Sequence, residues 1–247
     1  MIWRLVISIA AVVALASLAG CESTQQTSQR LSLNAKKLLN AEGLKITQRN
    51  AQIKAVSVAS FKDQYGTAVV VNLKNSGPTQ LNVPIAIALI GKKKKNIWNN
   101  SIPGLDTSLI SAAAVEKGNS FWVNNQIDTN VTPRRVTAEV GASSERPKGP
   151  MPVIKLSDES FKTDVSGIYL SGEVKNKSKI IQKRLVISCV SLAGNQLKAA
   201  GRAVIDVLRP APTPKPVRFR VYFIGNPKGG KVKCLAPPTT LTGDTAT

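Results

Sequence analysis

The side chains best suited to catalysis and metal binding are scarce in this chain of 247 residues. It has no histidine, which removes the commonest general base and the commonest neutral metal ligand. Its acidic residues are scattered, and nothing marks a pocket around Asp63, Asp158 or Glu159 that would support acid–base chemistry. No nucleophile elbow, phosphate-binding glycine loop or cluster of metal ligands is evident. The sequence therefore predicts no catalytic residue, no metal and no cofactor, and a protein that is not an enzyme.

Three cysteines remain, and the first of them closes an export signal. The positive charge of Arg4 precedes an apolar run from Leu5 to Leu15, which is too short for a stable membrane span. The run leads into Leu18-Ala19-Gly20-Cys21, which resembles the lipobox of bacterial prolipoproteins at each position. That resemblance implies cleavage before Cys21 and a diacylglycerol on its thiol, which would hold the protein on a membrane. An ordinary signal peptide with an incidental cysteine is the alternative.

The mature chain begins with a tether. The polar residues from Glu22 to Gln29 cannot bury enough apolar surface to fold, although a short helix between Leu31 and Leu44 is an alternative for its end. The segments that we expect are a signal peptide (1–20), the lipidated Cys and tether (21–50), a first β-sandwich (51–141), a linker rich in Ser, Gly and Pro (142–152), a second β-sandwich (153–240) and a disordered tail (241–247).

The two expected sandwiches repeat one another at an offset of about 100 residues. Ser60-Phe61-Lys62 returns as Ser160-Phe161-Lys162, and Lys74-Asn75-Ser76 corresponds to Lys175-Asn176-Lys177. Helical periodicity is absent, and short runs with period-two alternation or β-branched residues occur at 68–73, 83–90, 136–140, 168–174, 185–192, 203–208 and 217–224. The sequence thus predicts an all-β fold of two tandem antiparallel β-sandwich domains.

The second copy contains four features in a fixed order: a strand ending in Val-Lys-Asn, an apolar strand, a glycine turn and a last strand with Phe. The residues concerned are Gly172 to Asn176, Val186 to Leu192, Gly194 and Phe219-Arg220-Val221. This order resembles the small immunoglobulin-like modules of bacterial surface lipoproteins, including FxLYD domains, although the Leu-Tyr-Asp signature is not evident near Ser191. The resemblance implies binding or spacing modules.

The other two cysteines lie within the second copy. Cys189 is in an expected strand and Cys234 is in the last one, while the first copy has Ala88 and Ala138 near the equivalent places. Because export leads to an oxidising space, we expect Cys189 and Cys234 to form a structural disulfide. Two buried free thiols are the alternative.

Basic residues outnumber acidic ones by 34 to 14, a formal net charge of +20. Lys92, Lys93, Lys94 and Lys95 form an unbroken run in an expected hairpin turn, close to Trp98. These residues could contact a phosphate-bearing surface, but a solvated turn is the alternative. Phe121 and Trp122 should occupy opposite faces of a strand, so that one ring is exposed.

The export signal determines which anionic partners are expected. An exported protein meets lipid headgroups, wall polymers or lipopolysaccharide, and we expect no nucleic acid partner. The sequence predicts a lipid-anchored envelope protein, on the cell membrane or outer membrane and exposed to the periplasm or exterior. Its modules would bind an envelope protein or an anionic polymer. The alternatives are a structural spacer or accessory subunit without a ligand of its own and, more remotely, an unrecognised carbohydrate-active enzyme.

Overall fold

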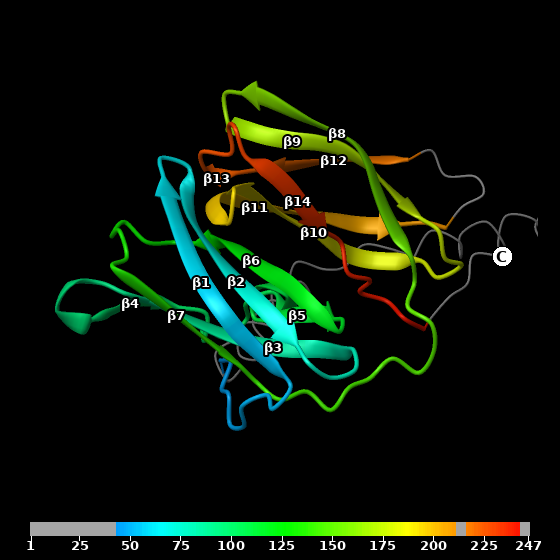
Figure 1. The fold of residues 1–247 in the computed structure, drawn as a ribbon, viewed down its shortest axis with the longest axis horizontal. Coiled ribbons are helices and arrows are strands. Elements are labelled where there is room, and N and C mark those ends of the chain that lie inside the picture. Colours follow the sequence, from blue (N-terminus) through cyan, green and yellow to red (C-terminus); the bar gives the residue numbers. More distant parts are fainter. Residues whose placement is uncertain (1–42, 211–215, 243–247) are drawn as a thin grey trace, which may run out of the picture. The chain divides into compact units, whose positions relative to one another are not determined.

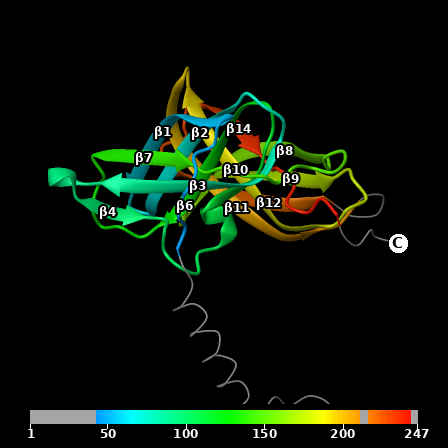
Figure 2. The same ribbon diagram turned by 90° about the horizontal axis from the view of Figure 1, so that it is seen from below.

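Antiparallel strands make up most of the structure. The computed structural model describes residues 43–210 and 216–242, so the signal peptide, Cys21, most of the tether and the last five residues lie outside the described part. Within that part the chain forms fourteen β-strands and two short 3-10 turns, and no α-helix (Figures 1 and 2). The predicted all-β fold of antiparallel sandwich sheets is confirmed.

The first seven strands form what we call the first lobe. One sheet has the order β1-β2-β6, and the facing sheet is centred on β3, which pairs with β4, β5 and β7. The elements are β1 (Ile53–Asp63), β2 (Gly66–Asn75), β3 (Gln80–Ile90), η2 (Lys92–Lys94), β4 (Asn96–Asn99), η3 (Thr107–Leu109), β5 (Ser111–Val115), β6 (Gly118–Ile127) and β7 (Arg135–Val140).

The second lobe repeats this pairing with two differences: one long strand replaces two short ones, and a short strand, β13, is added at the edge of β11. Its sheets have the orders β12-β9-β8 and β13-β11-β10-β14. The long strand β11 takes the place that β4 and β5 share in the first lobe, because each of these short strands pairs with a different end of β3. The strands are β8 (Ile154–Asp164), β9 (Gly167–Asn176), β10 (Gln182–Ala193), β11 (Gln196–Leu208), β12 (Val217–Tyr222), β13 (Ile224–Gly225) and β14 (Lys231–Leu235).

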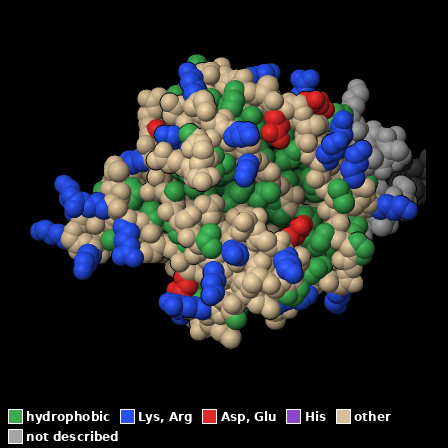
Figure 3. All heavy atoms as spheres, in the orientation of Figure 1, with side chains coloured by type: hydrophobic (Ala, Val, Ile, Leu, Met, Phe, Trp, Pro, Cys, Tyr) green, Lys and Arg blue, Asp and Glu red, His purple; other side chains and the backbone are tan. Residues whose placement is uncertain are grey.

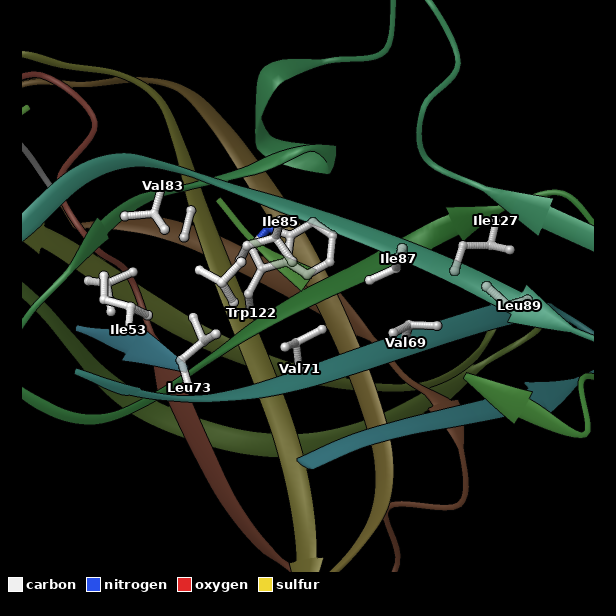
Figure 4. Packing of buried hydrophobic residues seen from close by; sticks show 13 residues of the cluster. Ile53, Val69, Val71, Leu73, Val83, Ile85, Ile87, Leu89, Trp122 and Ile127 are labelled. Carbon is white, nitrogen blue, oxygen red and sulfur yellow. The ribbon is translucent and has the colours of Figure 1, made fainter. Parts of the chain in front are cut away.

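Each lobe has its own core of mostly aliphatic side chains. In the first lobe, Val69, Val71 and Leu73 of β2 meet Ile85 and Ile87 of β3 between the two sheets, as Figure 4 shows. The second core is built in the same way around Leu170, Val174, Leu185, Ile187 and Phe219. Period-two alternation in these strands points every second side chain into a core, which is why the pattern predicted strands.

A third cluster, the interlobe core, lies between the lobes. It contains Ala68, Val70, Val123, Val190, Ala200 and Ile224. Residues 68–71 of β2 are all fully buried, so β2 is covered on both faces. Phe121 and Trp122 lie on opposite faces of β6, as predicted, but neither ring is exposed: Trp122 is only 5% exposed in the first core, and Phe121 is half-buried against the interlobe core. The described residues accordingly form one compact unit.

Equivalent buried asparagines close the turn after β2 and the turn after β9. The Asn75 side chain donates to the carbonyl oxygens of Pro78 (2.9 Å) and Val115 (3.0 Å). Asn176 donates likewise to Ile180 (2.7 Å) and Leu208 (3.2 Å). Each side-chain oxygen also accepts from the backbone two residues further on, which stabilises the turn. The repeated Lys-Asn motif is therefore a structural device of the fold.

The chain passes from one lobe to the other through the segment predicted as a linker, 142–152. Its first residues hydrogen-bond to the first lobe: the Ala142 N–H donates to Gln48 (2.8 Å), the Ser143 hydroxyl donates to the Leu81 carbonyl, and the Leu81 N–H donates to Glu145 (3.1 Å). This part of the connection is therefore attached along the side of β3.

The structure joins Cys189 and Cys234, which lie directly opposite one another on β10 and β14. The equivalent positions in the first lobe are Ile87 and Ala138, which also face each other. The internal repeat in the sequence predicts Ala88 as the counterpart of Cys189, but the strand register shows that the counterpart is the preceding residue, Ile87. Ile87 and Ala138 pack on the first core as Cys189 and Cys234 pack on the second, so the disulfide occupies a core position.

We predict that replacing both cysteines in a Cys189→Ala, Cys234→Ala variant lowers the free energy of unfolding by about 4 kcal/mol, because the bond closes a long loop in the unfolded chain. Denaturant titration of the oxidised protein and the variant measures this difference. A loss below about 1 kcal/mol would contradict the expected role of the bond.

Candidate functional site

The lysine run predicted from the sequence forms the tip of the β3–β4 hairpin, which projects at the left of Figures 1 and 2. We call Lys92 to Lys95 the basic turn, and all four side chains are exposed. Lys93 and Lys94 have positive φ angles of 56° and 58°. The turn is closed by backbone hydrogen bonds from Gly91 to Lys95 (2.8 Å) and from Lys95 to Lys92 (3.2 Å). The salt bridges between described residues involve none of these lysines.

Trp98 lies behind the basic turn and not at its tip. It sits opposite Leu89 in the hairpin, and its half-buried side chain packs against the first core. The basic turn therefore presents ammonium groups, while the indole helps to attach β4 to the lobe.

A second group of basic residues surrounds the matching region of the second lobe, and two of its members contact acids. Lys175 lies 3.9 Å from Glu173 within the same strand. Arg184 forms an ion pair with Asp106, which belongs to the first lobe. Arg184 has a φ angle of 51°, and the equivalent Asn82 has a φ angle of 47°, so the same backbone turn recurs in both lobes. In the second lobe it carries a charged side chain that reaches across to the first.

Asp106 lies in the segment between β4 and β5, which the second lobe lacks. Hydrogen bonds attach this segment to the first lobe. The Asn100 side chain donates to the carbonyl oxygens of Ile85 (2.8 Å) and Leu109 (2.9 Å), and the Trp122 ring N–H donates to the Ser108 carbonyl oxygen (3.1 Å). The sequence of the segment is rich in turn-forming residues, among them Asn100, Pro103 and Gly104, but nothing in that local pattern indicates a contact with the second lobe.

The segment brings Asp106 and Ser108 to two arginines of the second lobe. Burial alone would raise the pKa of Asp106, but hydrogen bonds from the hydroxyl and N–H of Ser108 and the charge of Arg184 lower it overall. The carboxylate is therefore ionised at neutral pH and can pair with Arg184. The Ser108 hydroxyl also accepts a hydrogen bond from Arg202 Nη2 (2.6 Å).

Arg202 is the least expected of these residues, because it is only 8% exposed. Burial lowers the pKa of its guanidinium, and the nearby Asp106 partly offsets that effect. Its Nε and Nη1 atoms have no hydrogen-bond partner among the described residues. Burying a guanidinium with few hydrogen-bond partners costs free energy, so Arg202 is expected to contribute little or nothing to stability.

Beside this network lies a cleft of about 600 Å³ between the lobes, within the size range of ligand sites. On the face drawn in Figure 3, hydrophobic side chains gather in a hollowed band between the two groups of strands, with Lys and Arg around it. The walls of this interlobe cleft come from β5, the start of β6, β10 and the chain after β14, and its apolar members include Ala113, Phe121, Val153, Val186 and Pro237.

We predict that Ser108→Ala lowers the free energy of unfolding by about 1–3 kcal/mol, because Arg202 then loses its one hydrogen bond while staying buried. Arg202→Met should be neutral or stabilising, because an apolar side chain of similar length leaves no charge in the interface. Thermal and denaturant unfolding of both variants measures the contrast. If Arg202→Met lowers the free energy of unfolding by more than about 3 kcal/mol, the guanidinium makes further stabilising hydrogen bonds and the prediction is wrong.

Features outside these sites add little. No group of acidic, histidine or cysteine side chains that could hold a metal occurs in the described part of the chain. No helix among the same residues is long and apolar enough to cross a membrane. No protein-family model, curated protein or solved structure matches this chain. Three features of the chain itself bear on its function: the lipobox-like signal, the basic turn and the interlobe cleft.

Proposed function

We propose that this chain is a non-enzymatic envelope lipoprotein, anchored through a lipid on Cys21, which binds an anionic envelope polymer through the basic turn. The observation that carries the proposal is the geometry of Lys92 to Lys95. The hairpin that bears these lysines is tied to the first core through Trp98 and Ile97, so the four ammonium groups are displayed on a fixed support.

The charge of the whole chain supports the same ligand class. A net charge of +20 creates a positive field that attracts phosphate-bearing polymers and lipid headgroups. Near such an anionic layer each exposed lysine contributes about 1 kcal/mol, so four adjacent lysines give a useful affinity without any shaped pocket. The Leu18-Ala19-Gly20-Cys21 sequence adds the location, because a lipidated Cys21 keeps the protein beside such polymers on the cell membrane or outer membrane.

A structural spacer or accessory subunit is the second candidate, and the interlobe core favours it. A pair of lobes joined by buried apolar side chains and by the Asp106–Arg184 ion pair holds a fixed relative orientation. Such a unit could space or position other envelope proteins without binding a polymer.

Binding to purified lipoteichoic acid and lipopolysaccharide distinguishes the two candidates. We expect that changing Lys92, Lys93, Lys94 and Lys95 to serine weakens polymer binding by at least roughly tenfold at low salt, and that the wild-type affinity falls steeply as salt is raised. Four exposed lysines elsewhere, changed to serine together, provide a control with the same loss of charge: Lys148, Lys155, Lys228 and Lys233. Equal loss in both variants, or no binding by the wild type, would favour the spacer.

Anchoring has its own test. We expect Cys21→Ser to abolish incorporation of labelled palmitate and to move the protein from the membrane fraction to the soluble fraction of the envelope, because no acylated thiol remains. Membrane association that survives this change at high salt would contradict the lipid anchor.

A further inference from the structure

One wall of the interlobe cleft is made by a strand edge. Seven consecutive residues, 111–117, line the cleft on one side, and the end of β14 with the chain after it, 235–239, lines it on the other. A strand that presents a face to a cleft contributes alternate residues, because successive side chains point to opposite sides. Consecutive residues indicate that the cleft runs along the edge of β5. The Ser111 and Val115 carbonyl oxygens already accept hydrogen bonds from the side chains of Trp122 (3.2 Å) and Asn75 (3.0 Å), so the edge is open around Ala113.

The strand β5 is an edge without the usual protection. It ends the β4-β3-β5 order, and its register with β3 passes from Val83↔Ala112 to Leu81↔Ala114 without pairing Ala113. Its five residues are Ser, Ala, Ala, Ala and Val, with no charge and no proline. Edge strands commonly carry charges that prevent another strand from pairing with them. The edge strands β1, β8, β12 and β14 do so, with Lys54, Lys155, Arg218 and Lys233 among their residues. The edge strands β4 and β6 carry no charge either, so what distinguishes β5 is that its small uncharged residues border the interlobe cleft.

The second lobe shows the same position in a protected form. The part of β11 equivalent to β5 contains Asp206, and the chain continues into Arg209 and Pro210. The first lobe therefore differs from its own repeat in having small uncharged residues at this edge, and the edge borders the interlobe cleft.

We propose that the interlobe cleft binds an extended peptide segment of a partner protein, which adds to β5 as a further antiparallel or parallel strand. Main-chain hydrogen bonds to the β5 edge would supply affinity, and the apolar side chains of the cleft would receive alternate side chains of the peptide. The charged residues on the lining are Lys117, Lys183 and Arg184 against Asp106 and Glu116. Because Asp106 is paired with Arg184, a small positive excess remains at Lys117 and Lys183, which favours a peptide with an acidic residue at one end.

The edge of β5 also favours a peptide over an acyl chain as the occupant. A hydrocarbon chain along β5 would bury the backbone polar groups of Ala113, which pair with no residue of β3, without giving them partners, and this costs free energy. A peptide backbone satisfies the same groups. The cleft lies apart from the basic turn, so this inference does not depend on polymer binding.

The test uses the full chain in lipid nanodiscs and a display library of random eight-residue peptides. We expect the selected peptides to alternate apolar residues and to carry Asp or Glu near one end. Ala113→Lys should weaken their binding at least roughly tenfold, because a charged side chain on an edge opposes strand pairing. Ala113→Ser should bind like the wild type, and Ser160→Lys on the edge strand β8 controls for the added charge. Hydrogen exchange should slow along β5 when peptide binds.

Three results would overturn the proposal: no peptide enriched above a library panned on empty nanodiscs, peptides whose affinity is the same for Ala113→Lys and Ser160→Lys, or exchange protection confined to strands other than β5. Lauric acid is tested in parallel. If it binds with the Ala113→Lys sensitivity expected of the peptides and none of them binds, the cleft is a lipid site and the strand-addition model fails. Unfolding midpoints of the variants within about 4 °C of wild type show that they are folded.

Discussion

Burial of β2 on both faces is the constraint on which the rest of the structure depends. Val69 and Val71 complete the core of the first lobe, while Ala68 and Val70 form the middle of the interlobe core. A strand covered on both sides must be apolar at successive positions, and Ala-Val-Val-Val at 68–71 meets that condition. If the lobes separated, the second face of β2 would be exposed to water together with Val123, Val190 and Ile224. The hydrophobic effect therefore opposes independent motion of the lobes, and the features at their junction are parts of one surface.

The internal repeat and its one interruption together create that surface. Both lobes use the same strand pairing, the same turn asparagines and the same pair of facing core positions, occupied by Ile87 and Ala138 in one and by the disulfide in the other. In the first lobe two short strands, β4 and β5, pair with β3, whereas in the second lobe the single long strand β11 pairs with β10. The segment between these two short strands carries Asp106 and Ser108 across to the second lobe, and the shortened β5 is left as the edge that borders the interlobe cleft. One insertion thus accounts for both the polar junction and the proposed peptide site.

The sequence predicted what depends on local pattern and failed where two distant segments meet. Period-two alternation predicted the strands, and the position of the cysteines in one copy predicted the disulfide. The turn lysines were correctly placed in a hairpin. The assumption that each strand has a solvent face led to the wrong prediction of an exposed ring at Phe121 or Trp122, because nothing local shows that a second lobe covers β6. Arg202 gave no signal either: an arginine in an alternating strand is normally exposed, and its burial follows from the approach of Ser108. The cleft likewise arises only when β5 and the chain after β14 are brought together.

The outer face of the second lobe differs from the face through which the first lobe contacts the second. Its outer sheet β12-β9-β8 corresponds to β1-β2-β6, whose outer face is apolar and receives the next lobe. At the equivalent places the cross-strand pair Val70–Val123 is replaced by Ser171–Arg220. Arg220 lies over the ring of Tyr169, 5.3 Å from its centroid, and Tyr222 donates a hydrogen bond to Asp164 (2.7 Å). A second copy stacked on this face would have to bury these charged and hydrogen-bonding groups against apolar side chains, which costs free energy. Because the interface between the lobes joins unlike surfaces, the same contact repeated between copies would form an open array, and the polar face of β12-β9-β8 opposes that contact.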